Sequence, residues 1–457
     1  LEFRRVLFRS ILSVISLVSY VLTKVAVTVY AGGLVFQQVF GIKELWGIDF
    51  FWIAAIGLVV LTALYTIFGG MKSVLYTSVL QTPILLLGSL IILVLGFKEL
   101  GGWDEMMRVC GAVTVNDYGD AMTNLIRSND DANFPWLGAL IGSAIIGFWY
   151  WCTDQFIVQR VLSGKNEKEA RRGTIFGAYL KLLPVFLFLI PGMIAFALHQ
   201  KYIGAGGEGF LPMLANGTAN ADAAFPTLVA KLLPAGVKGL VVCGILAALM
   251  SSLASLFNSS AMLFTIDFYK RFRPETPEKK LVGIGQIATV VIVILGILWI
   301  PIMRSVGDVL YTYLQDVQSV LAPGIAAAFL LGICWKRTSA QGGMWGLIAG
   351  MVIGLTRLGA KVYYSNAGEV ADSTFKYLFY DMNWLFFCGW MFLFCIIVVI
   401  VVSLATEAPT AEKIQGLVFG TATKEQKAAT RASWDHWDII HTAIILAITA
   451  AFYWYFW

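Results

Sequence analysis

Residues 384–405 read WLFFCGWMFLFCIIVVIVVSLA and contain no charged side chain. A helix of about 20 apolar residues crosses the roughly 30 Å hydrocarbon core of a bilayer, and soluble domains lack such runs. Comparable apolar segments recur along the whole chain, near residues 11–36, 50–69, 74–97, 136–160, 174–200, 237–265, 281–304, 309–335, 340–358 and 437–457. The sequence therefore predicts an all-α polytopic membrane protein with about 11 transmembrane helices.

The composition excludes several other classes of protein. Of the 457 residues, 58% are hydrophobic and only 13% are charged, against about 25% charged in a soluble domain. This argues against a soluble enzyme, a nucleic-acid partner and a disordered chain. The six cysteines lie mostly inside apolar runs without a CxxC pair, so we expect small buried side chains and no cysteine metal site.

The connections between the spans predict one membrane domain and its orientation. Residues 1–10, LEFRRVLFRS, are basic, start without Met and change abruptly into an apolar helix, so we expect a non-native scar there. Residues 11–457 then form a single transmembrane domain, because no connection is longer than a loop. The links 160–172, 270–280 and 335–338 are rich in Lys and Arg, which places them on the cytoplasmic side.

Two segments carry helix breakers. Residues 174–200 contain Pro184 and Pro191, and residues 309–335 contain Pro323 followed by Gly324. Broken helices near the midplane form the binding sites of many secondary transporters, but a proline can also merely kink a packing helix. Both interpretations stay open from the sequence.

A stripe of small polar residues runs along segment 237–265. Its members recur at helical spacing: Ala248, Ser251, Ser252, Ser255, Asn258 and Ser259. Small residues allow close helix packing, and paired hydroxyls also offer the hard oxygen ligands that suit an alkali cation. From spacing alone, packing is the simpler interpretation.

Intramembrane charged and amide side chains are costly and need a reason. Asp154 follows Tyr150 by four residues, on the same helix face, and could pair with Arg160 or Lys165 or cap a substrate path. Lys181 lies deep in its segment, which favours a buried role over snorkelling. Gln315 could bind hydroxyls or join helices, and Lys24 could be a buried counter-charge or line a water cavity.

Four motifs follow one another along the chain: YTIFGGMKS (65–73), WYWCTDQFIVQR (149–160) with YLKLLPVF (179–186) and PGM (191–193), SSLASLFNSSAMLFTIDFYKRF (251–272), and LAPGIAAAFLLGICWKR (321–337). In this order they resemble the sodium:solute symporter family, in particular its sodium/glucose cotransporters and bacterial sugar-transporting relatives. The resemblance runs from about Ile11 to the C-terminus.

This resemblance implies a LeuT-type fold of two inverted repeats, with residue 11 onward corresponding to the third core helix, so that the first helices of the fold are missing. Residues 11–335 are then the remainder of the core, and 340–457 are peripheral helices. The implied function is sodium-coupled symport of a hexose-like sugar or polyol by alternating access, in a bacterial plasma membrane. Sodium and a small solute are the partners, and a monomer is expected.

The resemblance also assigns roles to individual positions. Ala248, Ser251 and Ser252 fall on sodium-ligand positions. Lys181, Gln315 and Tyr150 fall on sugar-contacting positions, Tyr150 as the aromatic ring that closes the inner exit.

Two positions depart from the sugar-transporter pattern. Gly147 stands where relatives have a polar substrate contact, and Ser78 stands where they usually have an aspartate on the sodium path. Lys24, Asp154 and Ser78 are candidates for gating or the ion path. Inositol, sialic acid, an amino acid or a carboxylate remain alternative solutes. A membrane sensor of this fold has little support, because 406–436 is too short for a signalling domain, and no HExxH or GxSxG motif points to an enzyme.

Overall fold

The computed structural model describes residues 6–214, 217–306, 309–366 and 371–456. Side chains are described in these ranges except at 6–9, 65, 67–75, 77, 78, 80, 303–306 and 366. The described chain is helical apart from its connections and one short hairpin, in which β1 (Glu44–Leu45) pairs antiparallel with β2 (Ile48–Asp49). The fold class expected from the sequence is confirmed.

The longer helices are α1 (Val6–Ser19), α2 (Ala26–Phe40), α3 (Phe50–Leu100), α5 (Trp136–Phe148), α7 (Glu167–Pro184), α8 (Ile190–Gly204), α10 (Ala235–Met262), α12 (Glu278–Val306), α13 (Leu310–Cys334), α14 (Ala340–Asn366), α16 (Trp384–Ala405) and α19 (His436–Tyr455). The shorter ones are α4 (Trp103–Gly111), α6 (Gln155–Leu162), α9 (Ala224–Leu232), α11 (Lys270–Phe272), α15 (Thr374–Lys376), α17 (Ala411–Ile414) and α18 (Lys424–Ala432). Wider π-helical turns continue several of them: η2 (Tyr20–Val25), η3 (Trp149–Thr153), η4 (Val185–Leu189), η6 (Leu263–Tyr269) and η7 (Tyr377–Asp381). A 3₁₀ turn, η5 (Ala221–Ala223), precedes α9.

Within the described residues, 10 helical segments are long and apolar enough to cross a membrane. The sequence predicted eleven, and the difference lies in α3. The spans expected at 50–69 and 74–97 both fall inside this one helix, which is helical from Phe50 to Leu100. Its first part contributes only a shorter apolar stretch, Phe50–Leu64. The expected turn between the two spans carries no proline to end the helix; the proline of α3 is Pro83.

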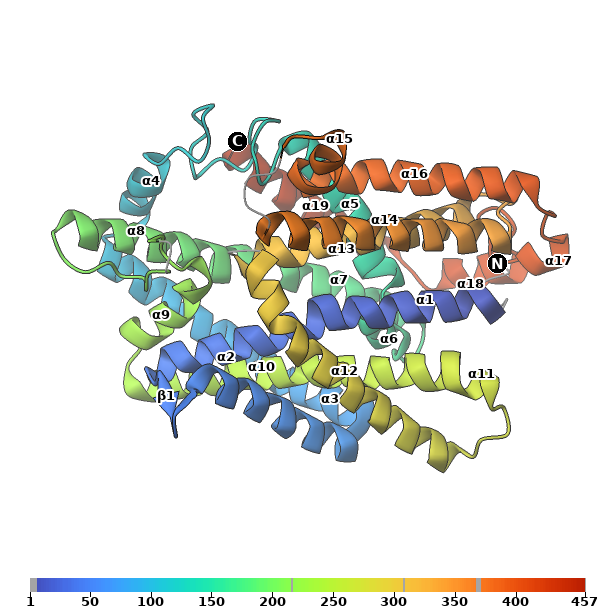
Figure 1. The fold of residues 1–457 in the computed structure, drawn as a ribbon, viewed down its shortest axis with the longest axis horizontal. Helices are drawn as coiled ribbons and strands as arrows, with labels where there is room; N and C mark the ends of the chain where they lie inside the picture. Colours follow the sequence, from blue (N-terminus) through green and yellow to red (C-terminus); the bar gives the residue numbers. More distant parts are fainter. Residues whose placement is uncertain (1–5, 215–216, 307–308, 367–370, 457) are drawn as a thin grey trace. The chain divides into compact units, whose positions relative to one another are not determined.

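The chain divides into two compact units. The first contains Leu1–Lys24, Arg127–Ile175 and Ser259–Ile444. In it α13, α14 and α16 pack against one another, as the upper part of Figure 1 shows, and α5 packs against both α13 and α16. The apolar core of this unit is centred on the same helices: Ile145, Trp149, Ala322, Ile325, Leu347, Leu385 and Cys388 are all buried.

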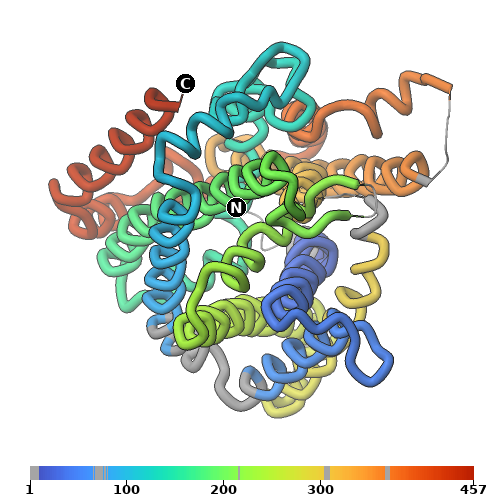
Figure 2. The backbone as a smooth tube through the Cα atoms, turned by 90° about the vertical axis from the view of Figure 1, so that its left-hand side faces the viewer, coloured from blue at the N-terminus to red at the C-terminus, as the bar shows by residue number. Residues whose placement is uncertain are grey.

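The second unit contains Val25–Ile126, Phe176–Asn258 and Ile445–Trp457. Here α2 packs against α3, and the chain turns between them through the β1–β2 hairpin, in the blue part of Figure 2. Helices α8 and α9 pack against each other, and α4 packs against α8. Their buried apolar side chains, among them Ile92, Met106, Ile194, Leu198 and Leu228, form the core of this unit.

The prolines do not interrupt their segments. Pro184 ends α7 and Pro191 lies at the start of α8, but the π-helical turn η4 joins the two helices without a gap. Pro323 lies inside the continuous helix α13. Next to it, Gly324 serves close packing, because a Cβ atom on Gly350 of α14 would lie 2.9 Å from the Gly324 Cα. Of the two interpretations of Pro323-Gly324, the structure favours helix packing.

Candidate functional site

The chain leaves helical geometry at Asp154, directly after the apolar segment Trp136–Thr153. Helix α5 continues through η3 to Thr153, and Asp154 then takes an extended conformation with φ −75° and ψ 118° before α6 begins. The Asp154 carboxylate caps α6 by accepting a hydrogen bond from the Phe156 amide at 3.1 Å. A discontinuous helix is a typical place for a transporter binding site, because it exposes helix ends to a ligand.

Asp154 is buried and fully engaged in polar contacts. Its Oδ1 also accepts a hydrogen bond from the Tyr20 hydroxyl at 2.9 Å, and its Oδ2 forms an ion pair with the Lys24 ammonium. The side chains of Lys24 and Asp154 are only 8% and 2% exposed. An ion pair so far from water is stable only when further hydrogen bonds satisfy its polar atoms, and the Tyr20 hydroxyl and the Phe156 amide supply them to the carboxylate.

Aromatic rings surround the Lys24 ammonium. Its Nζ lies 4.4 Å from the ring centroid of Phe156, 4.7 Å from that of Tyr20 and 5.3 Å from that of Tyr150. Ring faces attract a cation, and the attraction is stronger where water is excluded. The π-helical turn η2, which carries Tyr20 and Lys24, is therefore tied to the break at Asp154. Such turns are frequent at functional sites.

The sequence had singled out Lys24 and Asp154 separately, and the structure brings them together. The sequence offered Arg160 or Lys165 as possible partners of Asp154, and in the structure its ion pair is with Lys24 instead. Pairing between residues 130 apart in sequence cannot be read from local spacing. The break itself had a sequence signal that the proline argument overlooked, since Asp is a preferred helix N-cap residue.

Gly147 and Tyr150 lie just before the break. Both are half-buried. A Cβ atom added to Gly147 would meet nothing within 4 Å, so this face of α5 borders open space. The aromatic side chain of Tyr150 follows less than one turn later, beside Lys24.

Gln315 lies on α13 in the same unit. Its amide Nε2 donates a hydrogen bond to the Tyr311 hydroxyl at 2.8 Å, one turn earlier on the helix. Among the described residues, the Gln315 carbonyl oxygen has no hydrogen-bond partner, and the residue is half-buried. It can therefore accept a hydrogen bond from a hydroxyl group.

The neighbouring Asp316 belongs to a charged cluster that sequence reasoning missed. Lys361 Nζ lies 2.5 Å from its Oδ2, and Arg357 Nη2 lies 3.5 Å from its Oδ1. Arg357 is fully buried, donates to the carbonyl of Met382 at 2.7 Å and lies 4.1 Å from the Phe387 ring centroid. An arginine within the apolar segment 340–358 was the signal available in the sequence.

The polar stripe of α10 lies on a partly buried face of the helix. Ser251 is buried, whereas Ala248 and Ser252 are half-buried. The Ser255 hydroxyl donates to the Ser251 carbonyl at 3.0 Å. Further along, in the first unit, Ser259 accepts a hydrogen bond from the Gln159 amide at 2.6 Å. The stripe thus supplies hydroxyl oxygens and helix contacts from one face.

The structure adds little to the predicted roles of two site residues, Lys181 and Ser78. The Lys181 side chain on α7 is exposed, and the buried position expected for it is not observed. It belongs to the second unit, as do Ala248, Ser251 and Ser252, whereas Tyr150, Gly147 and Gln315 belong to the first. Ser78 lies in α3, and its side chain is outside the described part of the structure.

A many-spanning helical protein with a discontinuous helix and a buried ion pair at the break has the features of a secondary transporter. The model of the sodium:solute symporter family matches residues 2–350. The chain is 35% identical to the sodium/mannose cotransporter SLC5A10 of Bos taurus, over 98% of this chain and 77% of that protein. The chain therefore belongs to the sodium:solute symporter family, a family of transporters and not of enzymes, and it is an integral membrane protein.

Two further relatives have a similar sequence identity to this chain. Human sodium/myo-inositol cotransporter 2 is 35% identical, with 90% of this chain and 62% of that protein covered. Mouse sodium/glucose cotransporter 4 is also 35% identical, with 90% and 60% covered. The chain thus spans about three fifths of the length of these two relatives.

A solved structure shares the fold. A Na⁺-coupled sialic acid symporter in a substrate-bound outward-open state matches with a TM-score of 0.64, at 21% sequence identity, over 88% of this chain and 76% of that one. The chain accordingly has the LeuT-type fold.

Proposed function

We propose that the protein carrying this chain is a sodium-coupled symporter that takes up a hexose-like sugar or a related polyol by alternating access. The observation that carries the proposal is the likeness of nearly the whole chain to sodium cotransporters named for mannose, myo-inositol and glucose. These three solutes are neutral and polyhydroxylated. Sodium is a cosubstrate, and its gradient drives uptake.

The proposed sodium ligands are the carbonyl of Ala248 and the hydroxyls of Ser251 and Ser252. Hard oxygen ligands suit an alkali cation, and these residues share one face of α10. A ligand set on a partly covered helix face supports the proposal, because a transported ion needs both dehydration and an exit.

The proposed solute contacts are Tyr150, Gln315 and Lys181, with Gly147 leaving room. The open space beside Gly147 and the available Gln315 carbonyl oxygen support this assignment. An aromatic ring such as that of Tyr150 offers an apolar face to the C–H groups of a sugar. Lys181 is exposed, and its ammonium would donate hydrogen bonds to hydroxyl groups of the solute.

The proposed gate is the Lys24–Asp154 ion pair. Asp154 caps α6 through its Oδ1 and pairs with Lys24 through its Oδ2, so breaking the pair would release η2 from the start of that helix while the cap stays in place. Binding that favours one state of this element shifts the population of the two states, which is what coupling requires. Four expectations from the sequence stay predictions: a role of Ser78 on the ion path, a single transmembrane domain over 11–457, a monomeric state and a bacterial plasma membrane.

The proposal is tested by uptake into proteoliposomes with an imposed sodium gradient. Labelled glucose, mannose and myo-inositol are compared, with potassium in place of sodium as the first control. Ser252→Ala should reduce sodium-driven uptake at least tenfold, whereas Ser260→Ala, a buried serine on the same helix outside the proposed site, should not. Sodium-driven uptake of a carboxylate or an amino acid, with none of the three polyols, would overturn the solute assignment and keep the family's coupling.

A further inference from the structure

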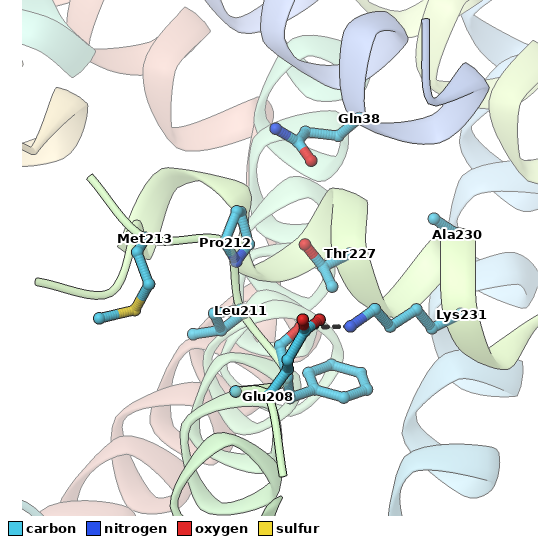
Figure 3. A pocket seen from close by; sticks show the side chains of 10 residues that line it. Gln38, Glu208, Leu211, Pro212, Met213, Thr227, Ala230 and Lys231 are labelled. Carbon is cyan, nitrogen blue, oxygen red and sulfur yellow. Dashed lines mark hydrogen bonds between the residues drawn. The ribbon is translucent and has the colours of Figure 1, made fainter. Parts of the chain in front are cut away.

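The second unit contains a polar cavity that is lined by none of the residues proposed above. It has a volume of about 460 Å³, within the roughly 300–1,000 Å³ range of small-molecule sites. Three parts of the unit line it: the end of α2, the loop after α8 and helix α9 (Figure 3). The segment 201–236 supplies most of the lining. It lies one predicted span from each of the links 160–172 and 270–280, which are expected on the cytoplasmic side, so the same rule places it outside the cell.

Thr227 shows that the cavity wall is built for a polar occupant. The residue is only 4% exposed, and its hydroxyl has no hydrogen-bond partner among the described residues. Helical threonines commonly donate to the carbonyl four residues earlier, as Thr62 does to Leu58 at 2.7 Å. Thr227 does not, and its oxygen faces the cavity in Figure 3. A buried hydroxyl without a partner is costly unless something in the cavity bonds to it.

Polar groups of complementary kinds surround Thr227. Lys231 lies one turn later on the same face of α9, and its ammonium donates one hydrogen bond, to the Phe210 carbonyl at 2.7 Å. Gln38 projects from α2, and Glu208 lines the cavity from the loop after α8 (Figure 3). Within the described part of the chain, neither of these two side chains has a hydrogen-bond or ion-pair partner.

The chemistry of the lining selects the ligand class. Lys231 and Glu208 carry opposite charges, so the wall has no net charge to attract a simple ion. An ammonium only donates, a carboxylate only accepts, and the threonine hydroxyl and glutamine amide do both. Hydroxyl groups also both donate and accept, so one polyol can satisfy all four groups. Leu211, Pro212 and Met213 add an apolar patch for the C–H face of such a molecule.

We propose that this cavity is a second, external binding site for a neutral polyhydroxylated solute, with Thr227, Lys231, Gln38 and Glu208 as its polar contacts. The choice of solute class rests on the proposed function, but the existence of the site does not. Because no residue of the proposed sodium site lines it, binding here should not depend on sodium.

Cysteine protection in the purified chain, in lipid nanodiscs, tests the proposal. Met213, at 56% exposure on the rim, is replaced by Cys, and the three exposed native cysteines Cys152, Cys243 and Cys334 are replaced by Ser. The rate of reaction with a membrane-impermeant maleimide is measured against the concentration of myo-inositol or glucose. We expect saturable slowing of at least threefold, equal in sodium and in potassium.

Thr227→Val removes the hydroxyl and keeps the shape, so it should raise the half-protecting concentration roughly three- to tenfold. Thr62→Val, a buried threonine of the same unit that bonds to its own helix, is the matched control and should leave protection unchanged. Three results would each overturn the site. They are no protection by either polyol, the same half-protecting concentration in Thr227→Val as in the original chain, and protection by glycine betaine but by neither polyol. Loss of sodium-driven uptake with protection intact would instead count against the proposed function only.

Discussion

Neutralising Asp154 is the sharpest test of the buried ion pair at the helix break. In Asp154→Asn the Oδ1 atom can still accept hydrogen bonds from the Tyr20 hydroxyl and the Phe156 amide, which lie 2.9 Å and 3.1 Å from it. The helix cap is therefore kept. What changes is the side facing Lys24, where a charged oxygen becomes an amide donor next to an ammonium that only donates.

The expected magnitude follows from burial. Removing one partner of a buried ion pair typically costs about 3–5 kcal/mol, because the other charge is left without compensation. Here the Lys24 side chain is 8% exposed and has no other carboxylate within 4.0 Å among the described residues. The loss corresponds to roughly 150- to 5,000-fold in the folding equilibrium constant, at about 1.36 kcal/mol per tenfold.

Reversible unfolding in mixed detergent micelles, followed by circular dichroism, measures this cost. Four proteins form the cycle: the original chain, Asp154→Asn, Lys24→Met and the double variant. Methionine keeps the length of the lysine stem among the aromatic rings and removes the charge. We expect each single variant to lose several kcal/mol and the double variant to recover most of that loss.

The control is Glu105→Gln on α4. Glu105 pairs with Arg108 at 2.6 Å, but the arginine side chain is 71% exposed. The hydrogen bond from Arg108 lowers the pKa of Glu105, yet solvent screens the pair, and we expect no measurable change in stability. Additive losses in the Lys24/Asp154 double variant, or an Asp154→Asn variant as stable as the original, would refute the argument that the two charges compensate each other.

Three further outcomes are expected. Asp316→Asn leaves two cations beside each other in the first unit and should cost about 3 kcal/mol in the same unfolding assay, against no loss if the cluster is hydrated. Gly350→Ala puts a Cβ atom 2.9 Å from the Cα of Gly324 and should cost about 1–3 kcal/mol, whereas Gly359→Ala on the same helix meets nothing within 4 Å and should be neutral or stabilising. Burial raises the pKa of the Cys110 thiol to about 11. At pH 8 its thiolate fraction is therefore roughly 0.1%, against about a quarter for a free cysteine. Because the thiolate is the reactive form, maleimide labelling of Cys110 should be a few hundred-fold slower in the folded chain than in the unfolded chain. The same shift stabilises the fold below a pH of about 8.5, and that contribution is lost as the pH rises through about 11.

The sequence alone determined the class of fold, because the bilayer imposes its requirement locally. Every span must be about 20 apolar residues long whatever its neighbours are, so segments such as 384–405 can be recognised one at a time. Small polar residues at helical spacing likewise predicted the polar face of α10 around Ser251 and Ser252. The family resemblance rested on ordered motifs, which are also a property of the linear chain.

Only the tertiary structure decided which polar groups meet. Lys24 and Asp154 are 130 residues apart, and nothing near either of them in sequence names the other. The partner of Arg357 can be identified only in the folded chain, where Asp316 of α13 lies 3.5 Å from it. The missing hydrogen-bond partner of Thr227 can be seen only when the whole cavity wall is in place. Hydrophobicity acts on each residue by itself, whereas a charge or hydroxyl inside a membrane protein depends on its partner, and the fold supplies the partner.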